Sequence, residues 1–225
     1  MSDSHAHSHQ QAQAPGPAIG DLLAPPIDWS DHPLTYYEKR IIAIGNLLRE
    51  KGILTVDEIR RATEELEART PALGARVVAR AWVDPAYKAR LLANAKAAVE
   101  ELGIPTDTIN HLVVPENTDK VHHVVVCTLC SCYPRQLLGE PPDWYKSDAY
   151  KIRIIQDPRS VLRERGVHLA EDVEVRVLDS TADVRYLVLP RRPPGTEGWS
   201  EEQLATLVTR DAMIGVAEAL SPTSR

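Results

Sequence analysis

Apolar residues recur along the chain in two patterns, and the change between them falls at Pro105. From Leu34 to Gly103 the apolar positions are three and four residues apart, which is the spacing of amphipathic helices. After Pro105 they gather in short β-branched runs between turn-forming residues, which is typical of strands. The pattern predicts an α+β fold, with N-terminal helices followed by a mixed α/β domain.

Capping residues predict where the first two helices begin and end. An apolar stripe from Ile41 to Leu48 marks the first helix, and Gly52 is placed to end it because glycine readily adopts a left-handed conformation. Thr55 and Glu58 have the spacing of a capping box, so we expect the second helix to begin there and to run to about Arg69.

Two further helices are predicted after Pro71. Apolar residues from Leu73 to Ala81 recur at helical spacing and mark the first of them. Asp84-Pro85 is a favourable start for the second, since Asp can cap the helix and Pro fits its first position. We expect that helix to run to about Leu102.

The second half of the chain is predicted to contain strands. Val113-Val114 and Val124-Val125-Val126 are short β-branched runs. Valines alternate with charged residues from Val173 to Val177, which indicates a half-buried strand. We expect the segment from Tyr186 to Leu189 to be its hairpin partner, across a turn at residues 180–183.

Two short helices complete the predicted C-terminal half. Asp157-Pro158 opens one that ends at Gly166, because Asp can cap the helix and Pro fits its first position, as at Asp84-Pro85. Ser200 and Gln203 form a capping box for what we expect to be the final helix.

The first 33 residues are polar and rich in proline, with His5, His7 and His9 near the beginning. We interpret this segment as a flexible arm whose histidines are incidental. The alternative is that alternating histidines capture divalent metal ions for delivery to another part of the chain. Trp29, Tyr36 and Tyr37 suggest that the end of the arm docks on an apolar surface.

Composition and charge narrow the class of protein. Hydrophobic content of 43% and charged content of 26% are those of an ordinary soluble globular protein. A net charge of −6, with no block of Lys or Arg, argues against binding of nucleic acid. No apolar run approaches the roughly 20 residues that span a bilayer, and the N-terminus lacks a signal-peptide core, so a cytoplasmic location is expected.

All 3 cysteines of the chain, Cys127, Cys130 and Cys132, lie close together in sequence. Thiolates are soft metal ligands, and this spacing allows one loop to present three of them to a single ion. A structural zinc site usually needs a second Cys or Cys/His pair, and an iron–sulfur cluster normally needs a fourth cysteine. His122 and His123 precede the loop, but a strand would point them to opposite faces. We therefore predict a metal site that is neither a structural zinc site nor an iron–sulfur cluster.

Counting donors suggests which metal fits this loop. Three thiolates leave the site short of six ligands, and deprotonated backbone amides of Ser131 and Cys132 would supply a fourth and a fifth. Such strong-field donors suit a low-spin trivalent cobalt or iron ion better than zinc. One position would stay open, as catalysis by a Lewis acid requires.

The stretch from Val126 to Pro134 resembles the signature loop of the nitrile hydratase α subunit and of the related γ subunit of thiocyanate hydrolase. Thr128 and Tyr133 resemble the cobalt type of this loop, whereas iron-type members usually carry Ser and Thr there. Other segments similar to the family are 79–85, 116–118, 142–146, 185–190, 195–199 and 208–211.

The resemblance implies a modified cobalt centre, with one Co(III) ion per chain. Cys127, Cys130, Ser131 and Cys132 would bind the metal, with Cys130 oxidised to a sulfinate and Cys132 to a sulfenate. Arginines of a β-type partner subunit would pair with the oxidised cysteines, so the isolated chain should be inactive. A metallochaperone or activator is a further expected partner, and Thr128 and Ser131 would tune the sulfur ligands through hydrogen bonds.

The implied reaction is addition of water to a nitrile, which gives an amide. The metal would polarise the nitrile, and the Cys132 sulfenate oxygen or a water that it activates would attack the carbon. The predicted catalytic residues are Cys132, Ser131 and Arg135. In this interpretation residues 1–33 form the arm, 34–104 a helical region and 105–225 the catalytic domain.

Two positions depart from the usual nitrile hydratase pattern. Arg135 stands where a pocket tryptophan is usual, and Thr108 aligns with the pocket glutamine. Arg135 also matches the thiocyanate hydrolase γ subunit, and an arginine would suit thiocyanate or a large polar nitrile such as a nucleoside nitrile. Alternatively it points outward to a carboxylate of the partner. A non-catalytic protein that binds or delivers metal is the remaining functional alternative.

Overall fold

The computed structural model describes residues 33–130 and 132–222. The predicted arm and Ser131 therefore lie outside the described residues, apart from the last position of the arm. Contacts divide the chain into two compact units, Met1–Leu66 and Glu67–Arg225.

The first unit contains the first two predicted helices. Helix α1 spans Tyr36–Glu50, and helix α2 spans Val56–Glu67 and so reaches the boundary. The predicted capping box opens α2, since the Glu58 amide donates to the Thr55 hydroxyl at 3.2 Å and the Thr55 amide donates to the Glu58 carboxylate at 2.7 Å. No residue of α1 is buried, and Tyr36 and Tyr37 are exposed.

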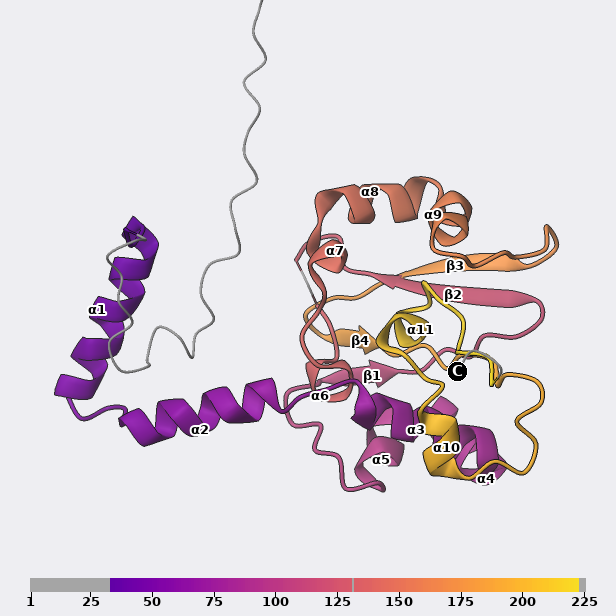
Figure 1. The fold of residues 1–225 in the computed structure, drawn as a ribbon, viewed down its shortest axis with the longest axis horizontal. Helices are drawn as coiled ribbons and strands as arrows, with labels where there is room; N and C mark the ends of the chain where they lie inside the picture. The colour runs from indigo at the N-terminus through magenta and orange to yellow at the C-terminus, as the bar shows by residue number, and fades with distance from the viewer. Residues whose placement is uncertain (1–32, 131, 223–225) are drawn as a thin grey trace, which may run out of the picture. The chain divides into compact units, whose positions relative to one another are not determined.

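The second unit combines helices and two pairs of strands. Its helices are α3 (Ala72–Val83), α4 (Pro85–Ala93), α5 (Ala95–Glu100), α6 (Arg135–Leu138), α7 (Asp143–Lys146), α8 (Asp148–Gln156), α9 (Pro158–Glu164), α10 (Glu201–Ala205) and α11 (Arg210–Ile214). Its strands are β1 (His111–Val113), β2 (Val121–Val126), β3 (Glu174–Asp179) and β4 (Val184–Tyr186). Helices α8 and α9 lie along one side of the β2–β3 pair, and α3, α4, α5 and α10 gather at the opposite end of the unit (Figure 1).

Both strand pairs are parallel, so the predicted hairpin is wrong. Strand β3 pairs with β2, with Val126 opposite Asp179, while β4 pairs with β1. The segment that follows β4 continues beside β1, since the Leu189 amide donates to the Pro115 carbonyl at 2.8 Å. Burial explains the difference: β2 is buried over five of its six residues and needs a neighbouring strand and covering helices. After β2 the chain forms α6–α9, which include the covering helices, and then returns as β3, the neighbouring strand.

Two helix predictions need correction. The helix expected to run from Pro85 to about Leu102 is broken at Asn94, whose side chain accepts a hydrogen bond from the Ala97 amide and so caps α5. The helix capped by Ser200 is confirmed as α10 but is not the last. Thr209 caps the further helix α11 in the same way.

The core of the second unit lies between α3, β2 and the segment after β4. Val77, Val124, Val126 and Leu187 are fully buried there. Glycine permits one close approach: a Cβ on Gly74 of α3 would lie 2.7 Å from the Met213 sulfur. None of the helices in the described ranges is long and apolar enough to cross a membrane.

A second close approach joins α11 to β2 and gives a stability prediction. A Cβ on Gly215, at φ +87°, would lie 2.0 Å from the His123 carbonyl oxygen. We expect Gly215→Ala to lower the free energy of unfolding by about 3 kcal/mol, from left-handed strain and overpacking together. Urea unfolding of the chain measures it.

Gly103→Ala is the matched control, because Gly103 has a similar φ of +72° and no neighbour within 4 Å of the added Cβ. It should cost only about 1 kcal/mol, from strain alone. Equal losses in the two variants would contradict the packing of α11 against β2.

Candidate metal centre

The three cysteine sulfurs converge at the end of β2. The Sγ atoms of Cys127 and Cys130 lie 3.5 Å apart, and those of Cys130 and Cys132 lie 3.1 Å apart. Within residues 33–130 and 132–222, these three residues form the one group of His, Cys, Asp or Glu side chains arranged to hold a metal. None of the three forms a disulfide.

The spacing of the sulfurs tests which metal geometry fits. With a metal–sulfur bond of about 2.3 Å, sulfurs at right angles lie about 3.3 Å apart, and sulfurs at tetrahedral angles about 3.8 Å apart. The Cys130–Cys132 distance of 3.1 Å is closer to the right-angle value, whereas the Cys127–Cys130 distance of 3.5 Å lies between the two values. All three sulfurs lie within 4.8 Å of one another, so their spacing fits the binding of one ion in either geometry.

The parallel β2–β3 ladder positions the start of the cysteine loop. Both strands end at the same edge, where Cys127 follows β2 and Asp179 closes β3. The Asp179 carboxylate accepts hydrogen bonds from the Thr128 amide at 3.0 Å and from the Thr128 hydroxyl at 2.6 Å. Sites in parallel sheets commonly form at this end of the strands.

This contact corrects the role expected for Thr128. Its hydroxyl donates to Asp179 and so supports the loop; it is not directed at a sulfur ligand. Sequence reasoning did not single out Asp179, because its importance depends on the parallel pairing that places it beside Thr128.

The three thiols differ in exposure. Cys127 is fully buried, Cys132 is buried and Cys130 is exposed. Burial, with the neighbouring Cys130 thiol, raises the pKa of the Cys132 thiol to about 12, although Arg185 acts in the opposite direction. Metal binding must therefore displace a proton from Cys132.

Buried tyrosines contact the backbone at the cysteine loop. The Tyr145 hydroxyl donates to the Cys132 backbone carbonyl at 3.1 Å, and the Tyr150 hydroxyl donates to the Val125 carbonyl at 2.7 Å. The rings of Tyr133 and Tyr145 meet edge to face, with centroids 5.3 Å apart. These contacts hold the backbone at Val125, before the first cysteine, and at Cys132, the third cysteine.

A cavity of about 280 Å³ opens beside Cys130 and Cys132. The structure places both predicted pocket residues, Arg135 and Thr108, in its lining. It adds two arginines that sequence reasoning missed, Arg69 and Arg185. In the sequence, Arg185 is distinguished only as the charged residue among the otherwise apolar residues 184–189.

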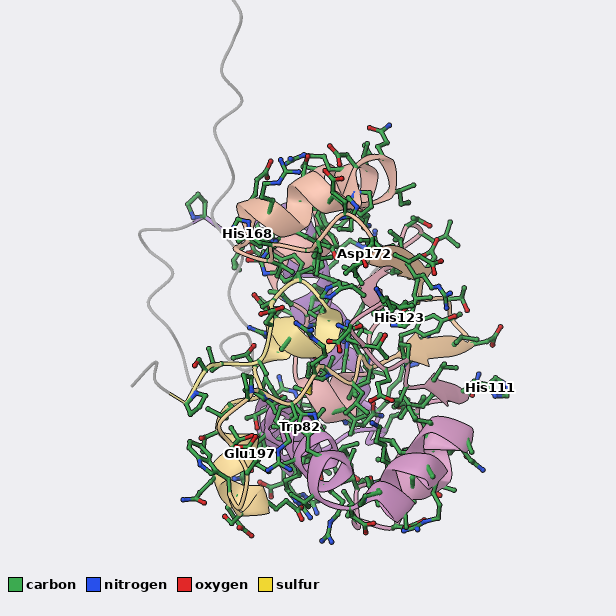
Figure 2. All side chains as sticks on the ribbon, turned by 90° about the vertical axis from the view of Figure 1, so that its right-hand side faces the viewer. Trp82, His111, His123, His168, Asp172 and Glu197 are labelled. Carbon is green, nitrogen blue, oxygen red and sulfur yellow. The ribbon has the colours of Figure 1, made fainter. Side chains whose placement is uncertain are left out.

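The histidines that precede the loop belong to a separate buried network. Asn117 bridges them: its amide nitrogen donates to His122 Nδ1 at 3.3 Å, and its carbonyl oxygen accepts from the His123 backbone amide at 2.7 Å. His122 Nε2 donates to the Gly215 carbonyl at 2.7 Å. Burial lowers the pKa of both imidazoles, which keeps them neutral at pH 7. Figure 2 shows His123 inside the unit, whereas His111 projects from its edge.

A second cavity, of about 600 Å³, lies beside His122 and Arg191. None of the cysteines lines it, and Arg191 is paired there with Asp119 and Glu218. The smaller cavity is therefore the one that adjoins the sulfur cluster.

Comparison with known proteins defines the class of this site. The family described as nitrile hydratase, alpha chain, matches residues 35–217, so the chain belongs to the nitrile hydratase α-chain family. The low-molecular weight cobalt-containing nitrile hydratase subunit alpha of Rhodococcus rhodochrous is 50% identical over 184 residues, covering 81% of this chain and 89% of that one. The resemblance predicted from the cysteine loop is confirmed, and the chain belongs to a family of enzyme subunits.

Two further similar proteins differ in the enzyme or the metal type that their names give. The thiocyanate hydrolase subunit gamma of Thiobacillus thioparus is 42% identical, over 78% of this chain and 77% of that one. The structure of an iron-type nitrile hydratase variant from Comamonas testosteroni Ni1 matches with a TM-score of 0.77 and 45% identity, over 83% of this chain and 91% of that one. The predicted α+β nitrile hydratase α-like fold is confirmed.

The Asp179–Thr128 contact gives a prediction about metal retention. Asp179→Asn removes the charge that holds the loop, and we expect metal affinity to fall about 10- to 100-fold, as for other residues that orient metal ligands. Competition with a chelator, followed by measurement of bound metal, tests this.

Asp172→Asn is the matched control, because Asp172 is an exposed aspartate that pairs with Lys120 at the protein surface. It should leave metal retention unchanged. Similar losses in both variants would mean that Asp179 has no specific role at the loop.

Proposed function

We propose that this chain is the metal-bearing catalytic subunit of a cobalt-type nitrile hydratase, which hydrates a nitrile to the amide. The observation that carries the proposal is the convergence of three cysteine sulfurs, 3.1 and 3.5 Å apart, beside an open cavity. Membership of the nitrile hydratase α-chain family and 50% identity to a cobalt-containing relative support it.

The metal is proposed to be a single Co(III) ion, with iron as the less favoured alternative. Cys127, Cys130 and Cys132 would hold it through sulfur, and the amides of Ser131 and Cys132 would complete five donors. When bound, such an ion supplies Lewis acidity that polarises the nitrile carbon toward attack.

The three cysteines have different proposed roles. Cys127, fully buried, remains a thiolate. Cys130 would be oxidised to a sulfinate and Cys132 to a sulfenate, with dioxygen as the external oxidant that accepts the electrons and supplies the oxygen atoms. The Cys132 sulfenate oxygen attacks the nitrile carbon, or it accepts a proton from the water that attacks. One water is consumed in either route, and its two hydrogens end on the amide nitrogen. If the sulfenate oxygen attacks, that oxygen becomes the amide carbonyl oxygen as its bond to sulfur breaks, and the oxygen of the water restores the sulfenate. If water attacks, its own oxygen becomes the carbonyl oxygen.

The chain's own contacts suit Cys132 for this role. Its carbonyl accepts a hydrogen bond from Tyr145, and Cys132 contributes to the lining of the cavity. The nucleophile is therefore fixed while the space in front of it stays open for substrate. Ser131, between the two modified cysteines, is proposed to donate a hydrogen bond that tunes the sulfur ligands.

The active enzyme is proposed to be a complex with a β-type subunit. Oxidised cysteines carry extra negative oxygens, and arginines from that subunit would pair with them. A metallochaperone or activator would load cobalt in the cytoplasm. Residues 1–33, 34–104 and 105–225 are proposed as arm, helical region and catalytic domain.

The cysteine chemistry can be tested directly. Mass spectrometry of the peptide that contains Cys127 to Cys132, taken from the native complex, should show two added oxygens on Cys130 and one on Cys132. Cys132→Ser should reduce turnover of any nitrile at least 1,000-fold, because it removes the nucleophile, while circular dichroism stays unchanged. Unmodified thiols with easily exchanged metal would instead identify a metal-binding or metal-delivery protein.

Arg135 favours a second candidate function, that of a thiocyanate hydrolase γ-type subunit. Its side chain lines the cavity beside Cys130 and Cys132, where a cation suits the thiocyanate anion. Among the described residues, Arg135 pairs only with Glu140, at 3.5 Å, and this ion pair is solvent-exposed. The relative with 42% identity shows that the family includes thiocyanate hydrolase.

Substitution at Arg135 separates the two candidates. If thiocyanate is the substrate, Arg135→Trp should lower kcat/KM for thiocyanate about 10-fold or more relative to that for a neutral nitrile, since the attracting charge is lost. Arg135→Lys keeps the charge and should preserve most of the ratio. Absence of thiocyanate turnover by the unmodified complex would eliminate this second candidate.

A further inference from the structure

Three arginines gather at the cavity beside the cysteine sulfurs. Arg69, Arg135 and Arg185 all contribute to its lining, and no Asp or Glu side chain does so. The chain as a whole has a net charge of −6, so this concentration of positive charge runs against its overall balance. Such a local field attracts and orients anions.

Carboxylates of the same chain neutralise these arginines only weakly. Arg69 forms no ion pair or side-chain hydrogen bond with any described residue. Arg185 donates to the backbone carbonyl of Thr181, which carries no charge. Arg135 lies 3.5 Å from Glu140, but the two side chains are 44% and 57% exposed, and such surface pairs contribute little.

Each arginine is supplied by a different part of the fold. Arg69 precedes α3, and its carbonyl packs against Gly139, where a Cβ would lie 2.6 Å away. Arg135 opens α6, and Arg185 lies in β4 opposite Leu112 of β1. Because separate elements hold them around one cavity, the positive charge is built into the architecture of the second unit.

The cavity is larger than a small inorganic anion needs. Thiocyanate has three heavy atoms and fills roughly 60 Å³, about twice the liquid volume of one water. The cavity measures about 280 Å³, and its lining includes the buried residues Ile109 and Tyr133 as well as Thr108 and Gln136. It can therefore receive an organic group together with an anionic one.

We propose that the substrate is an organic nitrile that carries a carboxylate, with its nitrile group toward Cys130 and Cys132 and its carboxylate toward the arginines. The guanidinium group binds carboxylates through paired hydrogen bonds, so Arg69 and Arg185 act as specificity-determining residues. This inference rests on the proposed function and names its substrate class.

The test compares two probes of nearly equal shape, 4-cyanobenzoate and the neutral 4-cyanobenzamide, on the complex reconstituted with its β-type partner. The kcat/KM should be about 10-fold or more higher for the anion at low ionic strength, and the preference should shrink with added salt. Arg69→Gln and Arg185→Gln should each lower that preference about 10-fold, mainly by raising KM for 4-cyanobenzoate.

Arg153→Gln is the matched control, because Arg153 pairs with Glu164 on the surface of α8, does not line the cavity and should leave the preference unchanged. Equal kcat/KM for the two probes would overturn the inference and leave the proposed function intact. Thiocyanate turnover above that of both nitriles would overturn it in favour of the second candidate. No turnover of any nitrile, with unmodified cysteines, would refute the proposed function itself.

Discussion

The site depends on the parallel pairing of β2 with β3. Parallel strands end at the same edge, so the pairing places the first cysteine and Asp179 at neighbouring positions although they are 52 positions apart in sequence (179 − 127). Asp179 then fixes Thr128, while Tyr145 and Tyr150 fix the backbone at Cys132 and Val125. A loop held on both sides can present three sulfurs at the spacing that one metal ion requires.

Local signals were sufficient for most helices and for the metal-binding loop. Caps at Thr55, Asp84 and Ser200 lie where the sequence predicts them, because capping depends on residues only three positions apart. The cysteines could be recognised for the same reason. Strand partners could not, since the alternating valines of β3 fit a hairpin as well as a parallel ladder. Asp179, Arg69 and Arg185 were missed because long-range packing alone brings them to the site.

The electrostatics of the site follow from this architecture. Burial and the neighbouring Cys130 thiol raise the pKa of the Cys132 thiol, so a metal ion must displace a proton to bind this sulfur as a thiolate. The arginines lie on the open side of the same cluster. The proposed reaction uses both features, since the sulfur cluster holds the metal and the nucleophile while the arginines select the substrate.

X-ray absorption at the cobalt edge of the native complex tests whether the three cysteines hold the proposed metal. We expect trivalent cobalt with three sulfur donors, from Cys127, Cys130 and Cys132, and two nitrogen donors, from the amides of Ser131 and Cys132. A four-coordinate tetrahedral shell, or a metal with fewer than three sulfur donors, would contradict it.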